Sequence, residues 1–217
     1  MMKHIGWIVV LALAGCGVWV PPKYQSPQIS SCAQPGSSLQ GVPFTRSSRG
    51  TCAVALAPFD VGAWHEAAFN SHKVRGEKKI KLGCRPLTPA AADCEYTGLQ
   101  GHSRTLMLNF DPSVYPEKAA VQRAVLAVYA FTNPQGLKEA QVRGRLSVGG
   151  ELESLASQRE VKTGWVLFDV TAFAARAINE RRNSVLFEIS QPCQADDQAP
   201  VTVGLLNKEP RLVVEFE

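Results

Sequence analysis

The chain has 217 residues, of which 45% are hydrophobic and 19% charged, so it can bury a core and is not a disordered polymer. Its formal net charge of +4 falls to +3 once residues 1–15, which include Lys3, are removed. No dense run of Lys and Arg accompanies this mild charge, so the composition argues against nucleic acid as a partner.

Residues 1–15 have the pattern of an export signal. Met1 to Lys3 form a short positive segment, and Ile5 to Ala14 form an apolar run of the expected length. The run ends in Leu13-Ala14-Gly15-Cys16, which resembles the lipobox of bacterial lipoproteins. The resemblance implies that the chain is cut before Cys16, that this thiol receives a diacyl group, and that the new amine receives a further, palmitate-type chain. The alternative is an ordinary export signal followed by a chance Cys.

The residue after Cys16 carries the prediction of location. In Gram-negative lipoproteins, Asp at this position commonly means retention in the inner membrane, and here it is Gly17. The resemblance therefore implies a lipid-anchored protein of the outer membrane, facing the periplasm or the cell surface. A spanning helix is not expected, because Gly15, Gly17 and Pro21-Pro22 interrupt the run before the roughly 20 residues that a span needs.

Residues 16–50 are predicted to hold the lipidated Cys and a tether. Many Ser, Gln and Gly residues accompany the prolines here, and such a segment cannot bury enough apolar surface to become ordered. The prolines are Pro21, Pro22, Pro27, Pro35 and Pro43. One folded domain is predicted over residues 51–217.

From residue 51 the apolar residues alternate with a period of two, which predicts antiparallel strands. The segment from Arg123 to Phe131 is apolar on both faces, as is typical of a central strand that is covered on each side. With turns between the short strands, the pattern predicts an all-β, jelly-roll-like antiparallel β-sandwich. The alternating apolar sets are Leu106, Leu108 and Phe110; Val142, Leu146 and Val148; Val185, Phe187 and Ile189; and Leu212, Val214 and Phe216.

One short helix is predicted near residues 171–180, where apolar residues recur at helical spacing. Asp169 or Thr171 is expected to accept a hydrogen bond from a free N–H of its first turn. We expect the helix to cover one open end of the sandwich. Its apolar face is Val170, Phe173, Ala174, Ala177 and Ile178.

The order of five segments is similar to that of DNRLRE-type domains. These segments are Arg104 to Asp111, Ala124 to Tyr129, Gly164 to Thr171 with its helix, Asn183 to Phe187, and Pro210 to Val214. The resemblance covers roughly residues 100–217. It implies a β-sandwich module of secreted and surface proteins, several of which are associated with polysaccharide binding. The motif that names the family is not present as such, so no ligand-binding residue is transferred.

Six cysteines predict disulfides, because an exported chain meets an oxidising compartment. Lipidation of Cys16 leaves five. Cys84 and Cys94 flank a short loop and are predicted to staple it, and the partner of Cys52 is predicted to be Cys32 or Cys193.

No catalytic or metal-binding motif is present in the sequence. His65-Glu66 is followed by His72 seven positions after His65, whereas zinc binding on one helix face needs the HExxH spacing. We therefore expect a protein that is not an enzyme and that holds no cofactor and no metal.

Two features are candidates for binding. Arg75, Lys78, Lys79 and Lys81 crowd one predicted strand, which either meets an anionic polymer or is a solvated edge that discourages aggregation. Trp165 either stacks on a sugar ring or belongs to the core. A loop between Cys84 and Cys94 beside the basic segment would be pre-organised for binding.

The sequence therefore predicts a non-catalytic, lipid-anchored binding module of the envelope that recognises a polysaccharide or a cell-wall glycan. The alternative is a protein-interaction lipoprotein, either an accessory subunit of a secretion or pilus machine or a periplasmic immunity protein against a toxin. The expected partners are the membrane, through the N-terminal lipid, and a glycan or an envelope protein.

Overall fold

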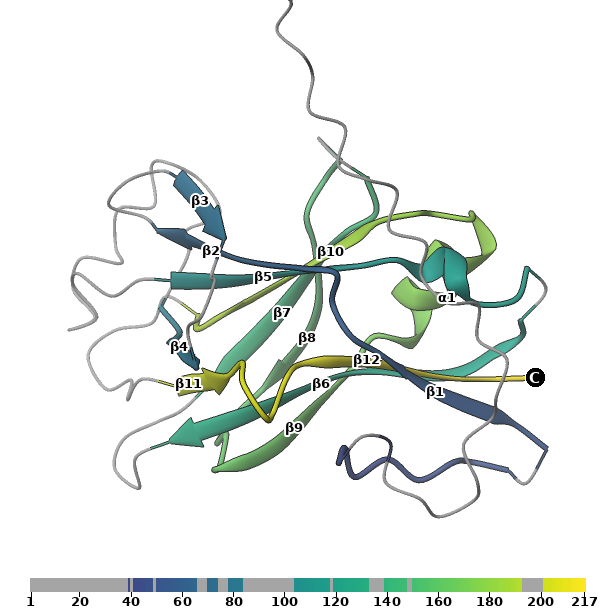
Figure 1. Ribbon diagram of the computed structural model, residues 1–217, viewed down its shortest axis with the longest axis horizontal. Coiled ribbons are helices and arrows are strands. Elements are labelled where there is room, and N and C mark those ends of the chain that lie inside the picture. The colour runs from purple at the N-terminus through teal and green to yellow at the C-terminus, as the bar shows by residue number, and fades with distance from the viewer. Residues whose placement is uncertain are drawn as a thin grey trace, which may run out of the picture.

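The computed structural model describes residues 39, 41–48, 50–65, 70–73, 78–83, 104–117, 119–132, 139–147, 150–192 and 201–217. Within these residues, twelve strands form two antiparallel sheets (Figure 1). The predicted all-β sandwich with one short helix near residues 171–180 is confirmed. The elements are β1 (Cys52–Leu56), β2 (Asp60–His65), β3 (Asn70–Lys73), β4 (Lys79–Lys81), β5 (Arg104–Phe110), the 3-10 helix η3 (Pro112–Val114), β6 (Val121–Thr132), β7 (Ala140–Arg145), β8 (Glu153–Gln158), β9 (Gly164–Asp169), α1 (Thr171–Asn179), β10 (Val185–Ser190), β11 (Val201–Gly204) and β12 (Arg211–Phe216).

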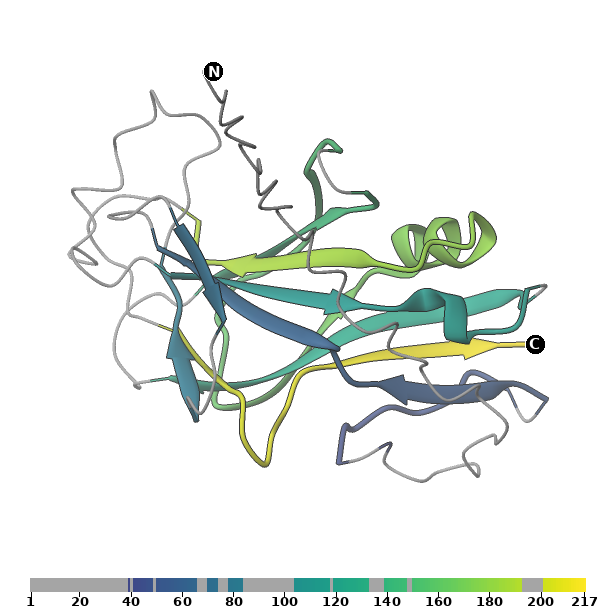
Figure 2. The same cartoon turned by 45° about the horizontal axis from the view of Figure 1, so that its top comes forward.

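The two sheets lie face to face as two layers (Figure 2). Sheet 1 has the order β1-β12-β6-β11-β4, with β9 on the other side of β6. Sheet 2 has the order β3-β2-β5-β10-β7-β8. The length of β6 explains its two partners on one side: β12 pairs with its first half, and β11 pairs with its end at Ala130 to Thr132.

The inward faces of both sheets form one hydrophobic core, as the period-two pattern predicts. Leu106, Leu108 and Phe110 of β5 are fully buried in it. The rings of Phe110 and Phe187 meet edge to face with centroids 5.7 Å apart, a geometry that aromatic quadrupoles favour.

Helix α1 lies at one end of the sandwich, at the start of β6 and β10 (Figure 1). Its Phe173 reaches into the core and meets Phe187 at 5.2 Å between centroids. Asp169 Oδ1 accepts the Thr171 N–H at 2.9 Å, as expected, and Thr171 Oγ1 accepts the N–H of Ala124 in β6 at the same distance. The first residue of the helix therefore holds it to β6 of sheet 1.

The outer face of sheet 1 is covered at one end by a segment that was predicted to be tether. We call Leu39 together with residues 41–48 the strap. Its Leu39, Val42 and Phe44 are buried and pack on the outward side chains of β1, β6 and β12. Both ribbon views show the strap beside β1 and β12, on the side away from sheet 2 (Figures 1 and 2). The expectation of a tether as far as residue 50 is therefore wrong for the strap, because its three apolar residues cover a face that would otherwise be exposed.

A buried carboxylate fastens the strap to the sheet. Glu215 of β12 points outward beneath it and is 0% exposed. Its Oε1 accepts the Ser47 N–H at 2.7 Å and the Ser47 hydroxyl at 2.9 Å, and it also accepts the Thr51 hydroxyl. Burial raises the pKa of the Glu215 carboxyl, but these hydrogen bonds outweigh it, so the pKa lies below its ordinary value.

Sheet 2 also buries charged residues on positions that the alternation assigns to solvent. Arg143 of β7 and Glu188 of β10 are cross-strand partners, and each is almost fully buried. Their Nη2 and Oε2 atoms are 3.5 Å apart. The alternation of apolar residues does not reveal this burial, because period two places a side chain on a face without saying what covers that face.

Among the described residues, no helix is long and apolar enough to cross a membrane, and no group of three or more His, Cys, Asp or Glu is placed to hold a metal ion.

Candidate functional site

The outer face of sheet 1 presents aromatic side chains next to the cluster that the strap buries, and one of them, the partly buried Trp165, packs against that cluster. In β6, the inward residues Val128 and Ala130 belong to the core, so Tyr129 and Phe131 point outward. Phe131 is 41% exposed, so a large apolar side chain meets solvent at this end of β6. The prediction that β6 is covered on both faces is thus right for its first half and wrong for its end.

Trp165 joins these two residues from the neighbouring strand. It is the cross-strand partner of Tyr129, and the two rings meet at 86° with centroids 5.6 Å apart. The rings of Tyr129 and Phe131 lie 5.0 Å apart and are tilted by 59°. We call Tyr129, Phe131 and Trp165 the aromatic face.

Gly204 in β11 makes room for this arrangement. A Cβ atom placed there would stand 3.1 Å from Cε2 of Phe131 and 3.3 Å from Cβ of Lys208. The missing side chain lets the Phe131 ring lie close against the backbone of the neighbouring strand.

The sheet brings two of the predicted lysines to the same face. Thr202 of β11 pairs with Phe131 on one side and with Lys81 on the other, and Gly204 pairs with Lys79. Neighbouring strands are about 4.8 Å apart, so Lys81 lies about 10 Å across the sheet from Phe131. Ile80 between the two lysines is buried in the core, which directs Lys79 and Lys81 outward.

A third lysine, which the sequence did not single out, completes the set. The turn after β11 carries Lys208, whose Nζ lies 5.1 Å from the centre of the Tyr129 ring and 6.0 Å from that of Trp165. We call Lys79, Lys81 and Lys208 the lysine rim. None of these three ammonium groups has an ion-pair partner among the described residues, whereas nearby Glu209 is paired with Arg211 at 2.8 Å.

The structure therefore places Trp165 on the same face of sheet 1 as Lys79 and Lys81, with β6 and β11 between their strands. Lys78 is exposed just before β4, and its carbonyl accepts the N–H groups of Leu205 and Leu206. Arg75 lies outside the described residues. Sequence reasoning missed Tyr129, Phe131 and Lys208. The consecutive outward aromatics at 129 and 131 were the available signal for the first two, and no sequence signal identified Lys208.

The cysteine predictions are tested at one position. Cys52 is disulfide-bonded, while Cys16, Cys32, Cys84, Cys94 and Cys193 all lie outside the described residues. The partner of Cys52 therefore also lies outside them, and the choice between Cys32 and Cys193 stays open.

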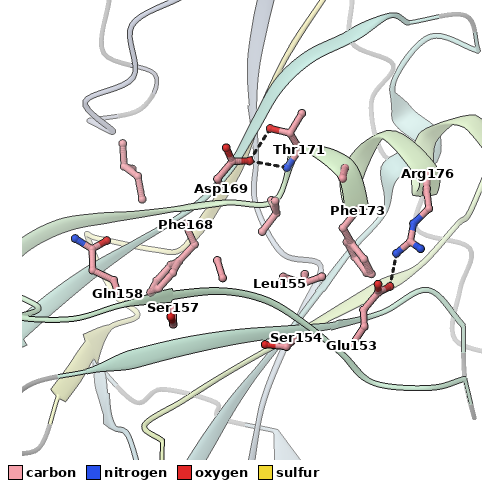
Figure 3. A pocket seen from close by; sticks show the side chains of 14 residues that line it. Glu153, Ser154, Leu155, Ser157, Gln158, Phe168, Asp169, Thr171, Phe173 and Arg176 are labelled. Atoms are coloured by element: carbon pink, nitrogen blue, oxygen red, sulfur yellow. Dashed lines mark hydrogen bonds and ion pairs between the residues drawn. The ribbon is translucent and has the colours of Figure 1, made fainter.

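A cleft of about 680 Å³ lies between the edges of the two sheets, lined by β8, the end of β9 and the start of α1 (Figure 3). Its floor includes the buried rings of Phe168 and Phe173. At its rim, Glu153 is paired with Arg176, and Asp169 accepts both the N–H and the hydroxyl of Thr171 (Figure 3). These bonds lower the pKa of the Asp169 carboxyl, with a smaller contribution from the charge of Arg123. The Asp169 carboxyl is thus stabilised in its ionised form, which does not favour a role for it as a general acid.

Comparison with known proteins adds no assignment. No protein-family model matches the chain, and no curated protein matches it.

Proposed function

We propose that this protein is a non-catalytic, lipid-anchored binding module of the bacterial envelope that recognises a polysaccharide or cell-wall glycan through the aromatic face. The observation that supports this most is the placement of Tyr129, Phe131 and Trp165 together on the outer face of a rigid sheet, with Phe131 41% exposed. The face of an aromatic ring is electron-rich and apolar, and the C–H face of a sugar ring packs against it. Anchoring through Cys16 would hold this face at the outer membrane.

A glycan array probed with the full-length lipoprotein in detergent tests this proposal. Truncation of the exposed ring in Phe131→Ala should weaken binding to every positive glycan by several-fold to about tenfold, the range of one aromatic contact. The melting temperature should change little, because the ring is largely outside the core.

Phe59→Ala is the matched control, since Phe59 is 43% exposed and precedes β2, away from the aromatic face. An array without positives, or an equal loss in both variants, would contradict the proposal.

A protein-interaction role is the second candidate, and the cleft favours it. In the described part of the chain, β8 pairs only with β7 and β9 only with β6, so both strands present free edges there. An extended peptide can add to such an edge through main-chain hydrogen bonds. Capture of an envelope protein that persists in Phe131→Ala, with no glycan bound, would favour this second role.

A further inference from the structure

We infer that the aromatic face selects acidic glycans and that Lys208 is the residue that sets this selectivity; the inference rests on the proposed glycan-binding function. Its basis is the position of the Lys208 ammonium group. In the free protein this cation lies over the rings of Tyr129 and Trp165, where the sugar would stack.

A neutral sugar and an acidic sugar meet this cation differently. To reach the two rings, a neutral sugar must displace the ammonium group, and the protein loses its cation–π interactions. At an exposed site such a loss is equivalent to about two- to fivefold in affinity. An acidic sugar carries an anion at the edge of its own ring. The displaced Lys208 ammonium group therefore loses its cation–π interactions but forms an ion pair with the sugar.

The other charges around the face act in the same direction. Lys79 and Lys81 lie across β11 from the aromatic side chains. Glu209 is ion-paired with Arg211, whereas Asp169 lies at the other end of β9 from Trp165, and Glu215 lies beneath the strap. No ion pair of the described residues joins a carboxylate to Lys79, Lys81 or Lys208, so the charge beside the aromatic face is positive.

The backbone around Lys208 supports a fixed approach of this side chain. Asn207 has a φ of 63°, in the left-handed region, which turns the chain back over the sheet directly before Lys208. The backbone N–H groups of Leu205 and Leu206 are bonded to the Lys78 carbonyl, so the start of this turn is held to β4. The backbone of the turn thus fixes the position from which Lys208 approaches the rings. The ammonium group at the end of its flexible side chain can still move from the rings to the anion of a bound sugar.

Two matched pairs of polymers test the inference on the full-length lipoprotein in detergent. One pair is polygalacturonate and its carboxyl-reduced form, and the other is dextran sulfate and dextran. We expect the acidic member of at least one pair to bind about tenfold more tightly than its neutral partner at low salt, and the preference to shrink at 0.5 M salt. The pair that shows the preference identifies the anion as a carboxylate or a sulfate.

Three variants then assign the selectivity to Lys208. Lys208→Met keeps an apolar side chain of similar length but removes the charge, and should lower the preference to about twofold or less. Lys208→Arg should retain it. Arg182→Met is the control, because Arg182 is an exposed cation after α1, at the opposite end of the sandwich, and it should retain the full preference.

The outcomes separate this inference from the proposed function. Equal binding of acidic and neutral members would overturn the inference while leaving glycan binding intact. An acidic preference that survives in Lys208→Met would overturn the role of Lys208. Binding of none of the four polymers would overturn the acidic selectivity, and the glycan array would then decide the proposed function separately.

Discussion

Glu215 shows how one residue can hold a whole segment in place. The carboxylate lies beneath the strap and accepts hydrogen bonds from Ser47, in the strap, and from Thr51, directly before β1. Its Oε2 has no hydrogen-bond partner in the described part of the chain, so the stabilisation seen there comes from Oε1. A sequence pattern cannot show this, since Glu at an outward strand position is ordinarily exposed.

We predict that Glu215→Gln lowers the free energy of unfolding by roughly 1–3 kcal/mol at pH 7, because charge-assisted hydrogen bonds to a buried group are replaced by weaker ones. Thermal unfolding measures this. Glu209→Gln is the control, because that carboxylate is about half exposed, and it should change stability by about 0.5 kcal/mol or less.

The same variant makes a pH-dependent prediction. Because the pKa of Glu215 is lower in the folded state than in the unfolded chain, its stabilisation is complete above the unfolded value of about 4.3 and is lost as the pH falls through the folded value. The stability gap between wild type and Glu215→Gln should therefore close at acidic pH. A gap that is constant from pH 7 to pH 3 would contradict the assignment.

At the scale of elements, α1 and β7 fit together through a missing side chain. A Cβ atom on Gly144 of β7 would stand 2.6 Å from Cδ1 of Leu155 and 2.7 Å from Cζ of Phe173. Leu155 sits in β8 at a shift of register against β7, and Phe173 is the helix residue that reaches the core. The side chains of Leu155 in β8 and Phe173 in α1 therefore both pack against the backbone of Gly144 in β7.

We predict that Gly144→Ala destabilises the domain by about 1–3 kcal/mol, as overpacking of a filled core does. Chemical denaturation measures the change. Gly50→Ala is the matched control, since no atom lies within 4 Å of a Cβ placed there, and it should have little effect. Equal stability of the two variants would show that Leu155 and Phe173 move aside freely.

At the scale of the whole molecule, the sequence predicted the fold better than the site. Alternation over residues such as Leu106, Leu108 and Phe110 reports which side chains face the core, and spacing over Phe173 and Ala177 reports a helix face, so both were predictable. The pairing of β11 with both β4 and β6 was not, because contacts between residues 79–81, 129–131 and 201–204 depend on strand order. That order is what places Trp165 and the lysine rim on one face.

The strap was missed for a related reason. Its composition, rich in Ser, Gly and Pro, is typical of a linker, and only three of its residues are large and apolar. Whether three such residues order a segment depends on a complementary apolar face elsewhere, here on β1, β6 and β12. The composition of a segment contains no information about such a face, so a boundary predicted from composition falls after the strap.

The anchor is the last prediction, and it concerns how the whole molecule meets the membrane. Lipoprotein acylation needs a thiol, and the lipobox-like Leu13-Ala14-Gly15-Cys16 presents one at position 16. Each buried methylene contributes about 0.8 kcal/mol, so several acyl chains on one residue give durable membrane binding. The Cys16→Ser variant should therefore not be labelled metabolically by an alkyne analogue of palmitate, and it should no longer be found in the lipid-anchored fraction. Cys52→Ser is the control: it removes a cysteine that the structure shows in a disulfide, and should keep the label whatever it does to stability. Label that survives in Cys16→Ser would contradict the lipoprotein assignment and, with it, the placement of the aromatic face at the outer membrane.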